Sequence, residues 1–195
     1  MPPSDAKAKL RKELLERRRL AAEQRPDAGT RLADHWPAAW GPVPHDAVAG
    51  YWPLPGELDP RPLMQALTGK GVRLCLPRMR GPHEPLEFLG WCAGDALVAG
   101  RFGVHEPESS APPCRPAIML VPLVGVDLRG HRLGFGLGYY DRTLETLRAQ
   151  GGVFAVGLAY AEQVVERLAV EAHDQPLDAV LTDAGVLDLT ALNPR

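Results

Sequence analysis

Residues 132–142 read Arg132-Leu133-Gly134-Phe135-Gly136-Leu137-Gly138-Tyr139-Tyr140-Asp141-Arg142, with glycine at three alternate positions. An apolar run at 117–126 precedes this segment and a helical pattern at 143–150 follows it. The order predicts a strand, a glycine loop and a helix. Because glycine has no Cβ, such a loop can adopt positive φ and bring backbone N–H groups close to a ligand. Those groups and the positive end of the following helix suit a phosphate.

The spacing of the glycines leaves two interpretations open. G-x-G-x-G differs from the dinucleotide-binding G-x-G-x-x-G and from the P-loop, which closes with Gly-Lys-Ser/Thr. Considered alone, the loop is as compatible with a tight turn as with a phosphate site. Arg132 and Arg142 at its two ends, and Asp141 at the start of the helix, favour a phosphate and metal-ion site.

The segments around this loop predict an α/β fold. A strand at 47–52, a short helix at 62–68 and a strand at 72–76 form a right-handed βαβ unit, which implies a parallel sheet. Apolar runs at 117–124, 153–158 and 179–182 predict further buried strands, and 161–168 is expected to be a helix. A second short helix is expected at 30–40. Weaker strands at 86–91 and 96–98 would be antiparallel additions, and 101–116 is expected to be a loop.

Composition points to a soluble globular protein. The chain has 195 residues, 45% of them hydrophobic and 24% charged, as in ordinary globular domains. A net charge of −2 gives no overall field that would favour nucleic acid or a membrane. No apolar run approaches the ~20 residues of a membrane span, and the three cysteines lack metal-type spacing. We therefore expect a cytoplasmic protein with reduced thiols and no nucleic-acid or membrane partner.

The N-terminal segment, about 5–24, predicts a basic helix with a narrow apolar stripe that includes Leu10 and Leu14. Most of its lysines and arginines are interpreted as a solvated face. Lys7 and Arg11 differ, because they lie four residues apart and so share one face of the helix.

Several of these segments together resemble a known family. Pro122, Asp127 and Gly130, followed by R-L-G-x-G-x-G-Y-Y-D-R, resemble the signature of the 5-formyltetrahydrofolate cyclo-ligase family, also called methenyltetrahydrofolate synthetases. The K-x-x-L-R pattern of Lys7 and Arg11 and the G-E pair that ends at Glu57 also match, so the resemblance covers residues 7–178. It implies one domain over 1–195. The implied fold is a three-layer α/β/α domain with a mostly parallel, Rossmann-like sheet and the N-terminal helix packed on it.

The resemblance also implies a reaction. Members of the family convert 5-formyltetrahydrofolate, with or without a polyglutamate tail, and ATP to 5,10-methenyltetrahydrofolate, ADP and phosphate, with Mg²⁺. ATP phosphorylates the formyl oxygen, a folate nitrogen attacks the activated carbon, and phosphate leaves as the ring closes. Phosphoryl transfer of this kind requires positioning and charge neutralisation more than covalent protein chemistry. We expect a monomer.

Site residues follow from the same resemblance. Its implied nucleotide-binding residues are Lys7, Arg11, Arg132, Leu133, Gly134, Phe135, Gly136, Leu137, Gly138, Tyr139 and Tyr140. Folate would contact Trp52, Glu57 and Tyr139, and the catalytic residues would be Arg132, Tyr139 and Asp141. Mg²⁺ would bind Asp141 and Asp174, with Asp178 left open as the alternative to Asp174.

Two departures and two alternatives remain. Phe135 and Leu137 stand where relatives often carry basic, aromatic or small residues, so we expect altered nucleotide affinity and retained activity. One alternative is a non-catalytic relative that binds folate and nucleotide. The other is a sugar-phosphate isomerase-like or CoA-transferase-like enzyme on the same architecture, which would need a base or a nucleophilic Glu and no ATP.

Overall fold

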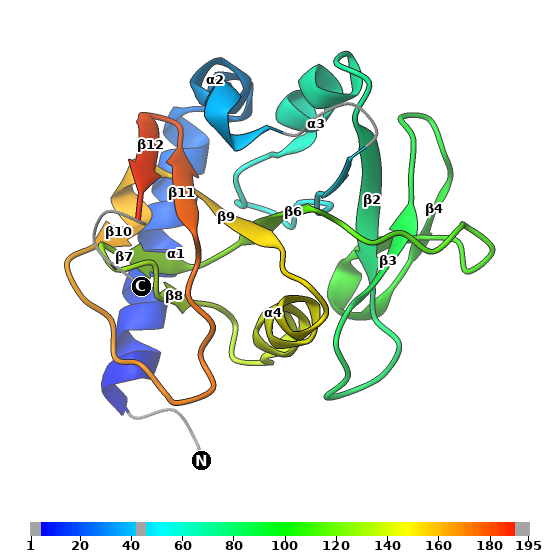
Figure 1. Cartoon of the computed structure of the whole chain (residues 1–195). Coiled ribbons are helices and arrows are strands. Elements are labelled where there is room, and N and C mark those ends of the chain that lie inside the picture. Colours follow the sequence, from blue (N-terminus) through cyan, green and yellow to red (C-terminus); the bar gives the residue numbers. More distant parts are fainter. Residues whose placement is uncertain (1–4, 42–45, 190–195) are drawn as a thin grey trace.

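The computed structural model of the chain describes residues 5–41 and 46–189, so the two ends of the predicted 1–195 domain lie outside the described residues. The described part is built around a seven-stranded sheet of order β12-β11-β9-β6-β1-β2-β3 (Figure 1). The inner neighbours pair in parallel, whereas β12 and β3 pair antiparallel at the two edges. The strands are β1 Ala47–Ala49, β2 Arg73–Arg78, β3 Glu87–Gly90, β6 Ile118–Pro122, β9 Phe154–Ala159, β11 Ala179–Thr182 and β12 Gly185–Asp188.

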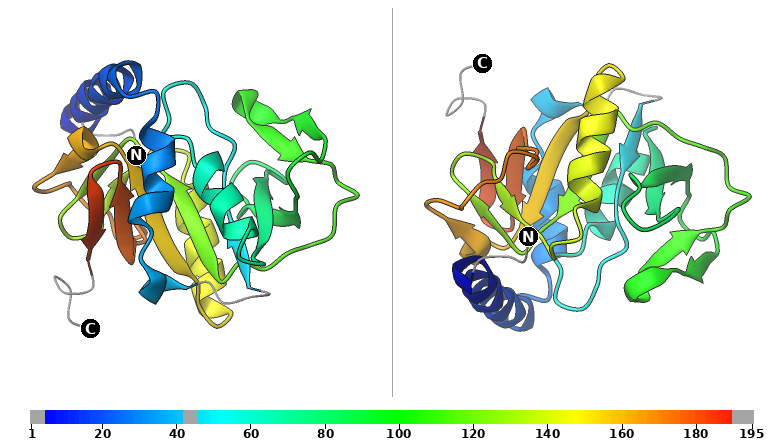
Figure 2. Two further views of the ribbon diagram at one scale, coloured as in Figure 1. Left: turned by 90° about the horizontal axis from the view of Figure 1, so that it is seen from above. Right: turned by 90° about the horizontal axis from the view of Figure 1, so that it is seen from below.

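Helices cover both faces of this sheet. Figure 2 shows α2 (Ala28–His35) and α3 (Arg61–Thr68) on one face and α4 (Tyr139–Ala149) on the other. The central strand β6 serves both layers: Leu120 packs into the core with Leu63 of α3, and the next residue, Val121, packs with Leu144 of α4. Alternate side chains of a strand point to opposite faces, so a strand buried on both faces is apolar throughout. The predicted three-layer α/β class is confirmed.

A second, smaller sheet supports the N-terminal helix. Its order is β10-β7-β8, with β7 Gly125–Asp127, β8 Arg132–Leu133 and β10 Val164–Val165. The helix α1 (Asp5–Gln24) has the predicted bounds and buries Leu14 against Val124 and Leu133. A Cβ on Gly125 would lie 2.4 Å from Cδ1 of Leu14, so the close approach of the helix requires glycine there. α1 therefore packs beside the glycine loop.

The predicted helix at 161–168 is wrong. Ala161–Gln163 forms one 3₁₀ turn (η3), and the chain then enters β10, which pairs in parallel with β7. The side chain of Gln163 accepts a hydrogen bond from the N–H of Tyr160 and donates to the carbonyls of Leu123 and Val124. These tertiary bonds stabilise the turn and the strand in place of a helix.

Smaller differences concern the ends and the loops. The predicted strand at 47–52 ends at Ala49, and the predicted helix at 30–40 is divided into α2 and a 3₁₀ turn, η1 Ala38–Trp40, by Pro37. The predicted loop at 101–116 contains a 3₁₀ turn, η2 Arg101–Gly103, and β5 His105–Pro107, which pairs with β4 Leu97–Ala99. Among the described residues, no helix is long and apolar enough to cross a membrane.

Candidate active site

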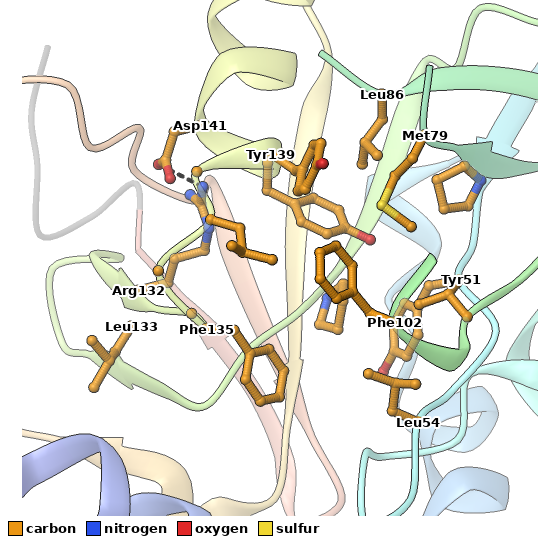
Figure 3. Close-up of a pocket in the computed structure, with 18 of the residues that line it drawn as sticks. Tyr51, Leu54, Met79, Leu86, Phe102, Arg132, Leu133, Phe135, Tyr139 and Asp141 are labelled. Atoms are coloured by element: carbon orange, nitrogen blue, oxygen red, sulfur yellow. Dashed lines mark hydrogen bonds and ion pairs between the residues drawn. The ribbon is translucent and has the colours of Figure 1, made fainter. Parts of the chain in front are cut away.

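A cavity of about 760 Å³ lies at the carboxyl edge of the parallel strands. Tyr51 and Trp52 follow β1, Met79 follows β2, and Pro122 ends β6. Open α/β sheets place their ligands at this edge. Figure 3 shows Arg132 and Asp141 on one side of the cavity and aromatic and aliphatic side chains on the other.

The structure brings nearly all of the predicted site residues to this one cavity. Its lining includes, among others, Lys7, Arg11, Trp52, Glu57, Arg132, Leu133, Gly134, Phe135, Gly136, Leu137, Gly138, Tyr139, Tyr140, Asp141 and Asp174. Asp178 is not part of the lining; its carboxylate accepts the N–H of Ala155 and lies 3.2 Å from Nη2 of Arg148. The two carboxylates left open by the sequence are thus separated: Asp174 is in the cavity, and Asp178 ties α4 to β9.

The glycine loop connects β8 to α4. Gly136 has φ of 92°, and Gly138, the N-cap residue of α4, has φ of 67°. Both values lie in the left-handed region that a side chain disfavours. The loop thus turns directly into the amino end of α4, where first-turn N–H groups and the helix dipole favour an anion. Arg11 donates from Nε to the carbonyl of Gly134 at 2.9 Å, which fixes α1 to the loop.

Charged side chains surround the loop in opposite-sign pairs. Nη2 of Arg132 lies 2.6 Å from Oδ1 of Asp141, and the Arg132 side chain is only 5% exposed. The backbone of Gln175 completes this arrangement, since its carbonyl accepts from Arg132 and its N–H donates to Asp141. Burial lowers the pKa of the Arg132 guanidinium, and the charge of Asp141 acts in the opposite direction. On α1, Nζ of Lys7 lies 2.8 Å from Glu171 and 3.9 Å from Asp174.

The opposite side of the cavity is aromatic and is lined by two buried carboxylates, those of Glu57 and Glu106. Trp52 contacts Trp91 edge to face at 6.0 Å between ring centroids. The Glu57 side chain is 5% exposed, and its Oε2 accepts the N–H of Leu54 at 2.9 Å. Burial raises the pKa of Glu57 above its ordinary value, while the Leu54 N–H and the nearby Arg18 oppose the rise.

The two tyrosines at the start of α4 differ in environment. The Tyr139 hydroxyl donates to the carbonyl of Gly81 at 3.3 Å, and the guanidinium of Arg142 lies over its ring at 5.2 Å. Tyr140 is half-buried and packs against the core on the α4 side of the sheet, and desolvation raises the pKa of its hydroxyl. Both tyrosines line the cavity, and Tyr140 is the one that also packs against the core.

A metal ion in this cavity would need ligands from the nucleotide as well as from the protein. Within residues 5–41 and 46–189, no group of three or more His, Cys, Asp or Glu side chains is arranged to hold a metal ion. Arg132 and Gln175 both bind Oδ1 of Asp141, so Oδ2 is the oxygen of this carboxylate that can meet a cation. Two carboxylates beside bound phosphate oxygens and waters are the set that Mg²⁺ prefers.

Sequence reasoning missed several lining residues. Phe102 lines the cavity from η2, is 59% exposed and has φ of 58°. Met79, Glu171 and His173 also line it. The sequence predicts that Arg18 belongs to the solvated face of the helix, but its side chain is 7% exposed and contacts Glu57. The spacing held the signal, because Leu14, Arg18 and Ala21 share one face of the helix.

Comparison with known proteins decides the family. The model of the 5-formyltetrahydrofolate cyclo-ligase family matches residues 3–183. The chain belongs to this family. The 5-formyltetrahydrofolate cyclo-ligase of Escherichia coli K12 is 36% identical over 176 residues, covering 87% of this chain and 96% of that relative. That of Mycolicibacterium smegmatis is 32% identical over 188 residues, covering 91% of this chain and 93% of the relative.

Solved structures of cyclo-ligases have the same fold. The 5,10-methenyltetrahydrofolate synthetase of Aquifex aeolicus superposes with a TM-score of 0.75 at 31% identity, covering 97% of this chain and 94% of that one. The synthetase of Mycoplasma pneumoniae gives a TM-score of 0.70 at 26% identity, covering 91% and 98%. The chain is therefore an enzyme of the cyclo-ligase family, a ligase of folate metabolism, and not an isomerase-like or CoA-transferase-like protein.

Proposed function

We propose that this enzyme converts 5-formyltetrahydrofolate to 5,10-methenyltetrahydrofolate at the expense of ATP, releasing ADP and phosphate. One observation carries the proposal: a glycine loop with flanking cations and an aromatic pocket with a buried carboxylate share a single cavity. The first half suits a triphosphate, and the second suits a planar, nitrogen-rich ring. Phosphorylation of one substrate by the other requires both to meet in one space.

The loop and its cations would hold the nucleotide. Backbone N–H groups at Gly134, Gly136 and Gly138 would face the phosphates, and Lys7 and Arg11 would add positive charge from α1. Arg132, held by Asp141 at 2.6 Å, would meet the transferring phosphoryl group. A guanidinium already fixed in a dry site stabilises charge in the transition state without reorganising.

Folate would occupy the aromatic side. Trp52 would form one wall, Tyr139 would lie against the pterin ring, and Glu57 would accept hydrogen bonds from its ring nitrogens. The formyl oxygen would then attack the γ-phosphorus while the bond to the β-phosphate oxygen breaks. The neighbouring nitrogen would next form the new C–N bond and release its proton, and the C–O bond would break as the ring closes, so that phosphate leaves with the bonding electrons.

Asp141 and Asp174 would hold Mg²⁺ together with phosphate oxygens. The ion would supply charge neutralisation for the phosphates. Lys7, 3.9 Å from Asp174, and Arg132, 2.6 Å from Asp141, would hold these two carboxylates in place.

One assay tests the proposal. Purified protein is mixed with 5-formyltetrahydrofolate and Mg-ATP, and methenyl absorbance is followed together with ADP. We expect equal amounts of both products and no reaction without ATP or with excess EDTA. Methenyl formation without ATP would reject the proposal. Binding of both ligands without methenyl formation would reject it as well.

A further inference from the structure

Arg18 differs from its neighbours on α1. Arg17 and Arg19 expose 45% and 52% of their side chains and pair with glutamates of the same helix. Arg18 exposes 7% and points toward the body of the protein, where it reaches Glu57. A buried guanidinium is costly unless a specific partner compensates it, so this contact requires an explanation.

The partner of Arg18 is a carboxylate that lines the aromatic side of the cavity. Nη1 of Arg18 lies 3.5 Å from Oε1 of Glu57, and the N–H of Leu54 donates to Oε2 at 2.9 Å. The two oxygens are therefore held from two sides. Phe135 of the glycine loop lies over the guanidinium, 5.5 Å from Cζ to the ring centroid, and so covers Arg18 while Glu57 still lines the cavity.

Few titratable groups act on Glu57. Arg18 approaches from α1, Tyr51 from the segment after β1 and Tyr140 from α4. Among these three only Arg18 carries a positive charge. Burial raises the pKa of Glu57, and Arg18 and the Leu54 N–H oppose that rise. Without the guanidinium, desolvation would leave this carboxyl protonated at higher pH.

We propose that Arg18 is a positioning residue that keeps the Glu57 carboxylate ionised and oriented toward the folate, under the cover of Phe135. This inference rests on the proposed function, which gives Glu57 the folate. The Arg18 guanidinium thus contacts both halves of the site. Its edge binds the carboxylate of Glu57 on the folate side, and the ring of Phe135 from the glycine loop lies over its face.

The pH profile of kcat/KM for 5-formyltetrahydrofolate, at saturating Mg-ATP, tests the proposal. Arg18→Met should move the acid limb of the profile to higher pH by about 1–2 units, the range that an adjacent opposite charge supplies. At an assay pH one unit below the pKa of Glu57 in the variant, about a tenth of the Glu57 carboxyl groups are ionised, so kcat/KM should fall about tenfold. Arg18→Lys keeps the positive charge, so the acid limb of its profile should lie close to that of the unaltered enzyme.

Arg17→Met is the matched control, because it removes an exposed arginine one residue away whose partner is Glu13 on the same helix. Its profile should match that of the unaltered enzyme. Thermal unfolding of each variant distinguishes a loss of stability from a change in the ionisation of Glu57. A less stable Arg18→Met with an unshifted acid limb would make Arg18 merely structural and overturn the inference.

Phe135→Ala gives a second test if Arg18→Met does not fold, since Phe135 is 49% exposed. Admitting water to the ion pair reduces the desolvation of Glu57, so the acid limb should move to lower pH. An unmoved limb would overturn the inference. If the unaltered enzyme shows no ATP-dependent turnover, the proposed function fails instead, and the two failures are distinct.

Discussion

Replacing Asp141 by Asn should affect both stability and turnover, because Asp141 is the partner of a buried guanidinium. Arg132 is 5% exposed and Asp141 21% exposed, with 2.6 Å between their charged atoms. Breaking a buried pair by removing one partner costs about 3–5 kcal/mol. Since Asp141 is partly hydrated, we expect about 2–3 kcal/mol here. For a domain of this size that corresponds to a Tm lower by about 4–12 °C.

Thermal and urea unfolding of Asp141→Asn, Arg132→Met and the double variant measure this effect. Loss of both charges leaves no unpaired ion, so the double variant should be less destabilised than the sum of the two single ones. Glu145→Gln is the control, because it removes one exposed carboxylate from the same helix. Additive free energies would show that the two side chains do not interact.

Turnover gives the second readout for Asp141. If this carboxylate holds Mg²⁺ beside the phosphates, Asp141→Asn should abolish ATP-dependent methenyl formation at temperatures where the variant is folded. Unchanged turnover with an intact Mg²⁺ requirement would remove Asp141 from the metal site.

Three further predictions concern the loop and its support. Arg132→Ala should lower kcat at least tenfold more than Arg142→Ala, measured at saturating substrates; equal losses would mean that the loop faces the other way. Gly136→Ala should lower the free energy of unfolding by about 1–2 kcal/mol, because φ is 92° there, and should weaken ATP binding. Gly134→Ala should fold normally, because a Cβ at that position has open space. Leu14→Ala should cost about 2–5 kcal/mol in urea unfolding, against less than ~0.5 kcal/mol for the exposed Leu20→Ala on the same helix.

The sequence predicts most of the fold, because the inner strands of the sheet are apolar on both faces. It does not predict β7 and β8, since two- and three-residue strands are too short to show a period. The error at 161–168 has a different origin. Gln163 there makes three hydrogen bonds to segments before and beside it, and tertiary contacts of this kind override local propensity.

The sequence predicts the glycine loop and its charged residues, but it does not predict the contacts between side chains that lie far apart in the chain. Arg132, Asp141 and the glycines stand in one continuous segment. The partnership of Arg18 with Glu57 joins residues 39 positions apart, and no local pattern names a partner at that distance. Asp174 and Asp178 have the same residue type four positions apart. Only the direction of the chain after Gln175 separates the cavity carboxylate from the one that binds Arg148.

The helix α1 has a consequence for biosynthesis. Lys7 and Arg11 bond to residues 164 and 123 positions later, so α1 leaves the ribosome long before these partners are made. At about 5–20 residues per second, Arg11 waits roughly 6–25 s for Gly134 to be made. An incomplete chain released well before that point exposes Leu14, because Val124 and Leu133, which cover it, have not yet been made, and transiently exposed apolar side chains favour aggregation.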